Sequence, residues 1–522
     1  MASDRPHIIV IGAGIGGLAT ALRLTAMNLR VTLVDAGHSP GGKMRQQESA
    51  AGPVDAGPTV LTMAHVFEEL FEAVGARLSD HLTLFREPLL ARHFWPDGSR
   101  LDLTDDLQRN IVAIDQFAGP AEAAAFKSFT LRAHALFAGF DQPMMQAPAP
   151  RLRDLVRHVV WNPKLAARMA PLSSLAQLLK STFRDVRLQQ LFGRYATYVG
   201  GAPGSVPALL SLIWASEFAG VWRVDGGMQR LAQAIADLAV ARGASFVPNT
   251  SVERIELQNE AVAGVVLSDG TRLSCDAVVF AGDPKALHQG MLGTPARRAV
   301  NRAGTGPRSF SAYVWHFGAE PIGSALAHHN VFFADRSGSE FDDLAVGQMP
   351  KDPTLYVCAQ DRGGAHQVGG LERFEIIMNG PAQQPAPQEE FALCQIRTFE
   401  RLEAMGLRFS PRPGRENLTT PTDFAARFPG SDGALYGRSP HGMMSAFQRP
   451  TARTSIPGLY LAGGGTHPGA GVPMACLSGR HAAAAIATDL ALTSTSRPMA
   501  TPGGISMGSA TTTAGRSPSS AL

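Results

Sequence analysis

Glycines at a fixed spacing mark the first place in this chain where chemistry could be supported. The run His7–Ile11, which is apolar from Ile8 on, leads into Gly12, Gly14 and Gly17. Gly12 permits a tight turn, Gly14 lets the backbone approach a pyrophosphate, and Gly17 lets a helix pack closely on a strand. Asp35 closes a second apolar run, where its carboxylate would accept a hydrogen bond from a ribose 2′-hydroxyl. This spacing predicts a dinucleotide site.

Three elements must position these residues: a strand over 7–11, a helix from about 16 to 27, and a strand over 31–34. The helix would direct unpaired N–H groups at the phosphates. An ordinary βαβ turn is the plainer interpretation, but it leaves the acid unexplained. The cofactor contacts expected here, with those of two further tight turns and one later strand, are Gly12, Ala13, Gly14, Ile15, Gly16, Gly17, Asp35, Ala36, Gly42, Lys43, Pro58, Thr59 and Val252.

A second glycine-rich segment lies near the far end of the chain. Residues 458–463 predict a short buried strand, and a helix is expected from about 475 to 490. A flavin is long enough to need such a second backbone surface, so this return favours FAD over NAD. A loop that only turns the chain is the alternative interpretation. The expected contacts are Gly463, Gly464, Gly471, Val472, Pro473 and Met474.

The middle of the chain continues the same domain. A helix is expected from about 226 to 243, because Met228, Leu231, Ile235 and Leu238 share one face. Strands are expected over 245–248, 252–257, 261–267 and 273–280. We therefore predict a discontinuous cofactor domain and inserted substrate segments, followed by a Ser-, Thr- and Pro-rich tail that is disordered. The predicted boundaries are 1–99, 221–300 and 441–492 for the cofactor domain, 100–220 and 301–440 for the inserts, and 493–522 for the tail.

Composition narrows the class of protein. The 522 residues are 45% hydrophobic and 17% charged, with a net charge of +3, which gives no reason to expect a nucleic acid partner. The four cysteines form no Cys-x-x-Cys pair, so we expect no cysteine zinc cluster, no bound metal and a reducing compartment. No apolar run is long enough to span a membrane, and the first residues lack a cleavable signal. A cytoplasmic location is expected.

Several motifs together resemble a known family. The segments 466–474 (Thr-His-Pro-Gly-Ala-Gly-Val-Pro-Met) and 477–482 (Leu-Ser-Gly-Arg-His-Ala) look like the closing motif of bacterial carotenoid desaturases. Residues 40–44, 55–59 and 226–228 sit where that family has matching turns. The resemblance covers the chain to about residue 492. It implies an α/β fold, with a Rossmann-like FAD-binding domain of the amine oxidase type and an inserted α+β substrate domain.

The wording of the closing motif is more similar to the hydroxyneurosporene (methoxyneurosporene) desaturase branch than to the phytoene branch. By that resemblance the chain introduces the C-3,4 double bond into acyclic 1-hydroxy- or 1-methoxycarotenoids of purple bacteria. Three positions depart from common patterns of the wider superfamily. Asp35 stands where many relatives carry Glu, Lys43 replaces an Arg and leaves a point charge for phosphate, and Gly464 replaces an acid.

Desaturation removes a hydride from one carbon and a proton from its neighbour, and only the flavin can take the hydride. The resemblance and the loop positions make Asp185 and His467 candidates for the proton acceptor or for binding the substrate hydroxyl. A histidine that only satisfies loop hydrogen bonds is an equal interpretation of His467. Trp214, Phe218 and Trp222 are the expected substrate lining, and plain core packing is their alternative.

A carotenoid lives in a bilayer, so a membrane surface is the expected partner. Residues 151–184 carry seven Lys or Arg against one acid, with apolar residues between them. This pattern is typical of a helix lying in an anionic interface, and equally of a solvated basic face. We expect peripheral association with the cytoplasmic membrane.

Rival functions remain at this point. A phytoene-type desaturase or a carotenoid isomerase would share the same motifs. Amine oxidases frame the substrate nitrogen with an aromatic pair beside the flavin. Residues 463–476 contain no Tyr, Trp or Phe, so this function is disfavoured. A non-catalytic prenyl-binding escort protein is disfavoured because such a protein needs no pyrophosphate cradle.

Overall fold

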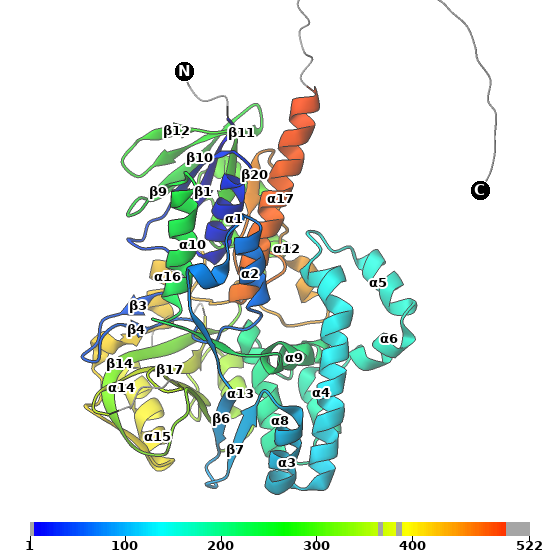
Figure 1. Ribbon diagram of the computed structural model, residues 1–522, viewed down its shortest axis with the longest axis vertical. Coiled ribbons are helices and arrows are strands. Elements are labelled where there is room, and N and C mark those ends of the chain that lie inside the picture. The colour runs from blue at the N-terminus through cyan, green and yellow to red at the C-terminus, as the bar shows by residue number, and fades with distance from the viewer. Residues whose placement is uncertain (1–4, 364–368, 383–388, 497–522) are drawn as a thin grey trace, which may run out of the picture.

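The computed structural model describes residues 5–363, 369–382 and 389–496 of the chain (Figure 1). Two bodies follow one another along the long axis of the molecule. The upper body in Figure 1 contains the first strand and the last helix, and the lower body contains most of the intervening chain. The predicted disordered tail lies outside the described residues from 497 onward, while residues 493–496 complete the last helix.

A five-stranded parallel sheet forms the centre of the upper body, in the order β20-β13-β1-β2-β9. Strand β1 is buried along its whole length, as its apolar sequence predicts. The strands come from three widely separated segments of the chain, 7–34, 245–280 and 459–461, so this sheet is discontinuous in sequence. Their bounds are β1 His7–Ile11, β2 Arg30–Val34, β9 Ser245–Val247, β13 Ala277–Phe280 and β20 Leu459–Leu461.

Helices cover one face of this sheet, and a three-stranded antiparallel sheet and short helices cover the other. The predicted apolar face of the helix after Gly226 is buried against the sheet. The helical face consists of α1 Ile15–Thr25, α2 His65–Glu72, α10 Gln229–Ala241 and α17 Val472–Ser496. The opposite face consists of β10 Val252–Gln258, β11 Ala261–Leu267, β12 Arg272–Ser274, α11 Pro284–Gln289, the 3-10 helix η5 Thr294–Ala299 and α12 Arg302–Thr305.

The strand predicted over 273–280 is two strands in two different sheets. β12 pairs with β11 in the small sheet, whereas β13 pairs with β1 in the parallel sheet. The step between them is fixed at Asp276, whose carboxylate accepts the N–H of His7 at 2.7 Å and whose N–H donates to the carbonyl of His7 at 2.9 Å. A polar residue within an apolar run was the signal of this break.

A larger mixed sheet forms the left part of the lower body (Figure 1). Its order is β18-β14-β17-β16-β15-β6-β7, with β19 paired to β14, and the β15–β6 pair is parallel. The predicted domain boundary at residue 99 falls inside the β6–β7 hairpin, so β6 belongs to this sheet. The strands are β6 Leu89–Phe94, β7 Arg100–Thr104, β14 Ser311–Gly323, β15 His329–Phe332, β16 Leu355–Ala359, β17 Glu372–Gly380, β18 Leu407–Ser410 and β19 Leu418–Thr419.

The two faces of this sheet differ in character. On β17, Phe374, Ile376 and Met378 point into an apolar core, and alternation therefore puts Glu375 on the opposite face. Helices α14 Glu390–Gln395 and α15 Arg401–Ala404, with the π-helix Ile396–Glu400 between them, cover the apolar face. The opposite face meets the turn at Thr59 of the upper body.

Helices form the right part of the lower body around an aromatic core (Figure 1). Helices α5 and α6 stand out from this body on the right of Figure 1. Within the described residues, we find no helix that combines the length and apolar character needed to cross a bilayer. The helices are α3 Leu107–Ala118, α4 Pro120–Phe140, the π-helix η2 Asp141–Met145, α5 Leu152–Val160, α6 Pro163–Met169, α7 Leu175–Thr182, α8 Val186–Gly193, the 3-10 helices η3 Arg194–Val199 and η4 Ala208–Leu212, and α9 Ile213–Phe218.

Shorter elements connect the bodies. β3 pairs with β4, and β5 pairs with β8. Helix α13 lies beside the larger sheet (Figure 1). The bounds are β3 Gln46–Gln47, β4 Val54–Asp55, β5 Leu84–Arg86, β8 Trp222–Val224, α13 Ser339–Ala345 and α16 Pro421–Arg427, with 3-10 helices at Leu78–Asp80, Arg415–Asn417 and Ser445–Gln448.

Candidate active site

The two predicted glycine turns meet side by side, and we call their contact the glycine seam (residues 12–17 and 463–471). A Cβ on Gly16 would lie 2.4 Å from the backbone nitrogen of Gly463, and a Cβ on Gly17 would lie 1.9 Å from the carbonyl oxygen of Gly12. Neither position has room for a side chain. By contrast, a Cβ on Gly14 would meet nothing within 4 Å, so the backbone is open there. The seam therefore combines tight packing with open space beside the main chain at Gly14.

The acid predicted at the end of β2 lies beside this turn. Asp35 accepts the N–H of Ala13 at 2.5 Å and the N–H of Gly37 at 2.6 Å. Its carboxylate is thus held at the mouth of the first turn, where the sequence placed it. Ala36 is exposed beside it, and Val252 packs against the apolar cluster on the far side of the sheet.

The second half of the seam is anchored by the last helix. Gly463 has a φ of +99°, which favours glycine, and its N–H donates to the hydroxyl of Ser478 at 2.7 Å. Helix α17 begins at Val472, three residues earlier than predicted, so Val472, Pro473 and Met474 form its first turn. Gly471 before it has open space around its α-carbon.

A third turn packs on the first one. Gly41 pairs with Gly14, and a Cβ on Gly42 would lie 3.2 Å from the α-carbon of Gly14. Lys43 does not direct its ammonium at the seam, because its Nζ donates to the carbonyl of Leu435 at 2.5 Å. Burial lowers the pKa of Lys43 to about 8. Its contact with a phosphate remains a prediction.

A chain of hydrogen-bonded side chains joins the larger sheet to this region, and we call it the polar chain (His329, Tyr356, Thr59, Glu375). Nδ1 of His329 lies 2.7 Å from the hydroxyl of Tyr356, which lies 2.9 Å from Oγ1 of Thr59. The hydroxyl of Thr59 donates to Oε2 of Glu375 at 3.3 Å. The four residues come from β15, β16, β17 and the turn after β4. Sequence patterns predicted only Thr59 among them.

Burial sets the charge state of the polar chain. It raises the pKa of Glu375 well above its ordinary value, and the nearby charge of Asp55 adds to the shift. It also raises the pKa of Tyr356 and lowers the pKa of His329. All three side chains favour their neutral forms. Oε1 of Glu375 and Nε2 of His329 are buried without a hydrogen-bond partner.

The loop around residues 436–449 contacts the second glycine segment of the seam and lies near the polar chain. Arg449 donates to the carbonyls of Gly464 and Tyr436, each at 2.9 Å. A Cβ on Gly437 would lie 3.1 Å from the α-carbon of Gly465. The pKa of Tyr436 is raised to about 12 by burial and by the proximity of Glu375, which places this phenol near the polar chain. The seam and the polar chain thus border the same loop.

Comparison with known proteins identifies the family. Residues 15–309 match the family model for flavin containing amine oxidoreductases, and residues 187–485 match that for FAD dependent oxidoreductases. A hydroxyneurosporene desaturase from Cereibacter sphaeroides is 53% identical over 93% of this chain and 98% of its own length. One from Rhodobacter capsulatus is 52% identical over 92% of this chain and 98% of its own length. The chain belongs to the carotenoid desaturase family of flavoproteins.

A solved structure supports the fold. An oxidoreductase from Methanosarcina mazei covers 91% of this chain and 99% of its own, with a TM-score of 0.58 at 15% identity. The predicted α/β fold with its FAD-binding domain is confirmed. The chain is an FAD-dependent oxidoreductase.

The residues of the seam fit FAD. Backbone at Gly14 is open toward the site, while Gly16, Gly17 and Gly463 leave no room for side chains. A pyrophosphate needs this kind of close backbone approach, and the carboxylate of Asp35 lies where a ribose is expected. Gly12 to Gly17, Asp35 and Gly463 to Gly471 are therefore the residues that would hold the dinucleotide.

The predicted catalytic residues lie on separate elements and have local partners. Nε2 of the buried His467 lies 2.9 Å from the carbonyl of Ala147, and burial lowers its pKa. This contact fits the alternative interpretation of His467, a histidine that only satisfies hydrogen bonds of its loop. Asp185 caps α8 and pairs with Arg187 at 2.6 Å. Burial opposes its ionisation, but the hydrogen bonds from Arg187 outweigh this effect and hold the pKa of Asp185 below its ordinary value.

The predicted substrate aromatics differ in their surroundings. Trp214 is fully buried, and its indole N–H donates to Thr130 at 3.0 Å, so it is a core residue of the helical body. Phe218 is half-buried against Trp214, with ring centroids 5.2 Å apart. Trp222 lies on β8, half-buried under the guanidinium of Arg86. The contacts of Trp214 are those of a core residue, which was the alternative interpretation. A role of Phe218 and Trp222 in lining the substrate site stays a prediction.

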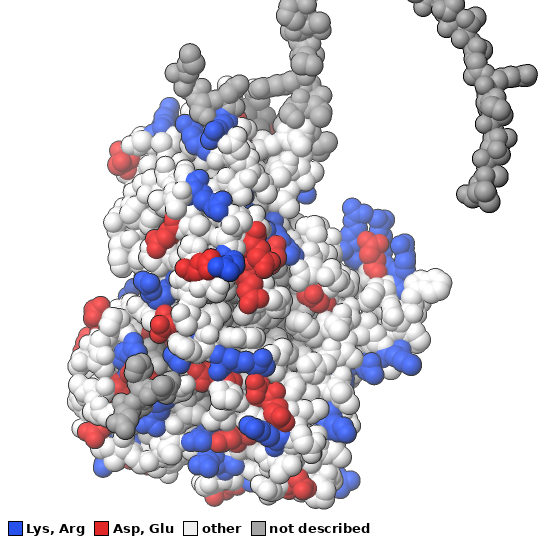
Figure 2. Space-filling model, viewed as in Figure 1, with Lys and Arg blue, Asp and Glu red and all other residues white. Residues whose placement is uncertain are grey.

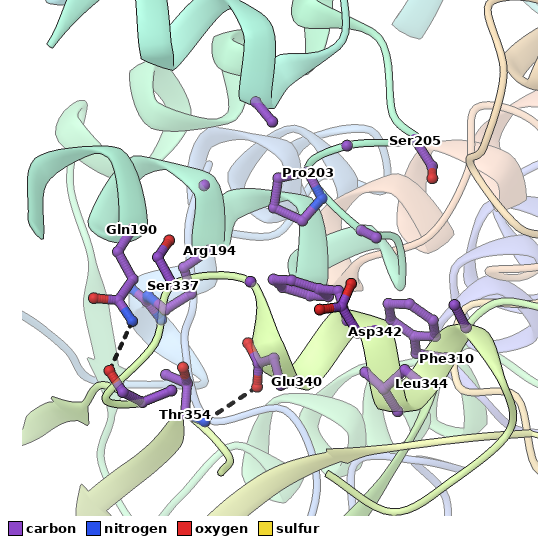
Figure 3. A pocket seen from close by; sticks show the side chains of 18 of the residues that line it. Gln190, Arg194, Pro203, Ser205, Phe310, Ser337, Glu340, Asp342, Leu344 and Thr354 are labelled. Atoms are coloured by element: carbon purple, nitrogen blue, oxygen red, sulfur yellow. Dashed lines mark hydrogen bonds between the residues drawn. The ribbon is translucent and has the colours of Figure 1, made fainter. Parts of the chain in front are cut away.

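A cavity of about 710 Å³ opens between α8 and α13 (Figure 3). Gln190 and Arg194 line one end of the view, and Phe310 and Leu344 line the other. Glu340 accepts the N–H of Thr354 at 3.1 Å, shown as a dashed line in Figure 3. The cavity wall at Ser309 adjoins the loop around the polar chain, because the N–H of Tyr436 donates to Oγ of Ser309 at 3.1 Å.

One group of potential metal ligands stands among the described residues. His328, His329 and Cys358 each offer a ligand atom, and these atoms lie within 4.8 Å of one another. Nδ1 of His328 lies 2.7 Å from the carbonyl of Arg362, and its Nε2 lies 3.6 Å from Sγ of Cys358. Hydrogen bonds therefore account for both nitrogens of His328.

Sequence reasoning missed Glu375, Tyr356 and His329. A signal was present on β17: Glu375 interrupts the apolar run Phe374, Ile376 to Met378 at a position that becomes fully buried. A buried carboxyl group within a strand demands a partner. The partner, Thr59, lies more than three hundred residues away, so no local pattern could name it.

Proposed function

We propose that this protein is an FAD-dependent desaturase that introduces the C-3,4 double bond into acyclic 1-hydroxy- and 1-methoxycarotenoids. The carrying observation is the 53% identity to a hydroxyneurosporene desaturase over 93% of this chain, together with a glycine seam that fits a dinucleotide. A 4,4'-diapolycopene oxygenase from Methylomonas, 29% identical over 94% of this chain, supports carotenoids as the wider substrate class.

Bound FAD supplies a hydride acceptor, which side chains cannot provide. The protein's own residues shape the site around the cofactor. The seam fixes the backbone on which the cofactor would rest, and the neutral polar chain adds no fixed charge to this region. His467 and Asp185 stay as proposed proton acceptors. Both side chains already have a local partner, which makes each less available to accept a proton from substrate.

Product analysis tests this function. The purified FAD-loaded protein is supplied with 1-hydroxyneurosporene, neurosporene and phytoene in liposomes, and the products are identified by absorption and mass. We expect loss of two mass units from the 1-hydroxycarotenoid. Conversion of phytoene alone would instead support a phytoene-type desaturase, and an unchanged mass with altered geometry would support an isomerase.

We further propose that α5 and α6 contact the membrane surface. Val160 and Trp161 at the end of α5 are 70% and 78% exposed, an unusual position for large apolar side chains. Arg153 and Arg157 are also exposed on this helix, at 70% each. Figure 2 shows Lys and Arg gathered where this part stands out from the body. An apolar tip with basic flanks suits an anionic interface.

Flotation with liposomes tests the contact. We expect the protein to float with vesicles containing anionic lipid, and expect Trp161→Ala with Val160→Ala to weaken flotation. Neutralising Arg153, Arg157 and Arg168 should weaken it further, by about 1 kcal/mol for each charge. Unchanged flotation of both variants would contradict the proposal. Leu371→Ala, on an exposed residue of the other body part, is the matched control.

A further inference from the structure

The polar chain ends in two buried atoms that lack partners. Oε1 of Glu375 and Nε2 of His329 make no hydrogen bond, and both residues are at most 2% exposed. An unpaired buried polar atom costs free energy, so proteins seldom keep one without a ligand or function to satisfy it. Every side-chain polar atom of the polar chain between these two ends makes a hydrogen bond.

The directions of the hydrogen bonds along the polar chain follow from Thr59 being the donor to Glu375. The hydroxyl of Thr59 donates to Oε2 of Glu375, so it accepts from the hydroxyl of Tyr356. Tyr356 in turn accepts from Nδ1–H of His329. With burial favouring the neutral carboxyl group, the proton of Glu375 resides on Oε1 and has no acceptor. The Glu375 end therefore presents a neutral donor.

The location of that donor is set by its neighbours. Thr59 closes the turn whose Gly57 would place a Cβ 2.0 Å from the carbonyl oxygen of Lys43, so this turn packs on the one beside Gly14. Tyr436, near Glu375, is held by Arg449, which also binds the carbonyl of Gly464. Glu375 is thus connected to both glycine segments of the seam, to one through Thr59 and its turn and to the other through Tyr436 and Arg449.

The substrate class supplies a matching group. A 1-hydroxy- or 1-methoxycarotenoid carries its oxygen on C-1, two carbon–carbon bonds from C-3. When the C-3,4 bond is held at the hydride acceptor, the oxygen on C-1 is therefore also held close to the flavin. The rest of such a substrate is hydrocarbon and offers no other partner to a buried donor. A donor suits both substrates, because hydroxyl and ether oxygens both accept.

We propose that Glu375 binds the oxygen on substrate C-1 and thereby sets the preference for oxygenated over plain acyclic carotenoids. Thr59 and Tyr356 act as positioning residues, because they hold the carboxyl group through Oε2. This inference rests on the proposed function for the identity of the substrate. It names a binding contact and leaves the proton acceptor of the reaction separate.

The experiment compares binding and conversion in the FAD-loaded protein. Dissociation constants for 1-hydroxyneurosporene and neurosporene are measured on the dithionite-reduced protein, which cannot accept a hydride, from the quenching of tryptophan fluorescence by the bound carotenoid. Conversion is measured in liposomes with the oxidised protein. Glu375→Leu should lower the preference for the hydroxylated substrate by about tenfold or more, with unchanged flavin content. Glu375→Gln retains a donor and an acceptor, so it should keep most of the preference.

The matched control is Glu122→Gln. Glu122 is also a buried glutamate with one unpartnered oxygen, and it lies on α4 in the helical body. We expect this variant to retain the wild-type preference. A wild-type preference in Glu375→Leu would overturn the inference. If that variant does not hold FAD, Thr59→Val provides the second test, since it removes the donor to Oε2, and an unchanged preference there would equally overturn it.

Failure of the proposed function has a different signature. If the wild-type protein converts none of the carotenoids, yet binds the hydroxylated one more tightly than neurosporene and loses this preference in Glu375→Leu, the reaction assignment fails and the contact stands. If it converts 1-hydroxyneurosporene while Glu375→Leu shows the same preference, the reaction assignment stands and the contact fails.

Discussion

The glycine seam and the polar chain lie next to each other but are built in opposite ways. The seam is made of backbone, and its function depends on the absence of side chains at Gly16, Gly17 and Gly463. The polar chain is made of side chains from three strands and one turn. We infer from this difference that the seam provides a property common to many flavoproteins, while the polar chain provides selectivity for oxygenated acyclic carotenoids. Perturbing each part separately should therefore change different measurements.

The largest effect is expected in the seam. Gly17→Ala would place a Cβ 1.9 Å from the carbonyl oxygen of Gly12, so strand β1 and helix α1 must separate. We expect loss of bound FAD, and a fall in unfolding free energy of about 3 kcal/mol or more. Flavin absorbance and thermal unfolding measure both. The control is Gly369→Ala, since a Cβ there meets nothing within 4 Å; equal flavin content in the two variants would contradict the role of the seam.

A smaller and more selective effect is expected in the polar chain. Tyr356→Phe removes the hydroxyl that joins His329 to Thr59. Two partners are left unpaired, so binding of the 1-hydroxycarotenoid should weaken by about tenfold while flavin content stays constant. Tyr313→Phe, on the other face of the same sheet, should leave substrate binding unchanged. A parallel loss of flavin in Tyr356→Phe would remove the distinction between the two regions.

His467→Ala tests the border between the regions, because this residue belongs to the loop of the seam. We expect turnover to fall more than flavin content. Loss of one loop hydrogen bond corresponds to roughly a fivefold decrease, whereas loss of a proton acceptor corresponds to a hundredfold or more. Steady-state kinetics with a parallel flavin determination separate the two. Full turnover with bound flavin would exclude His467 from both roles.

At neutral pH the smallest effect is expected from the titration of a buried histidine, which changes stability only in acid. Burial lowers the pKa of His481 to about 4, with Arg480 and His467 nearby, and its Nε2 lies 3.1 Å from the carbonyl of Met145. Because the folded chain disfavours the imidazolium, its stability should decrease as the pH falls from 6.5 toward 4, and this histidine should contribute no pH dependence above 6.5. Unfolding midpoints across this window measure the effect. His481→Gln should flatten the profile, and an unchanged slope would contradict the assignment.

The contrast also explains what the sequence could predict. Gly12, Gly14, Gly17 and Asp35 act within one βαβ unit, so their spacing alone indicated the cofactor turn. The partnership of the two glycine segments followed from the length of a flavin and from a family resemblance. Trp214 was harder, because local sequence does not distinguish a cavity lining from an aromatic core. Glu375 and Tyr356 acquire meaning only through Thr59, which the chain brings to them by its tertiary fold.

The contact of Gly16 with Gly463 and of Gly479 with Gly16 has a consequence for biosynthesis. During translation residues 12–17 leave the ribosome hundreds of residues before residues 463–471. A nascent chain therefore has only half of the backbone that would hold the coenzyme. We therefore expect tight binding of FAD only after the final helix has been synthesised. Prematurely terminated chains should accumulate as colourless protein.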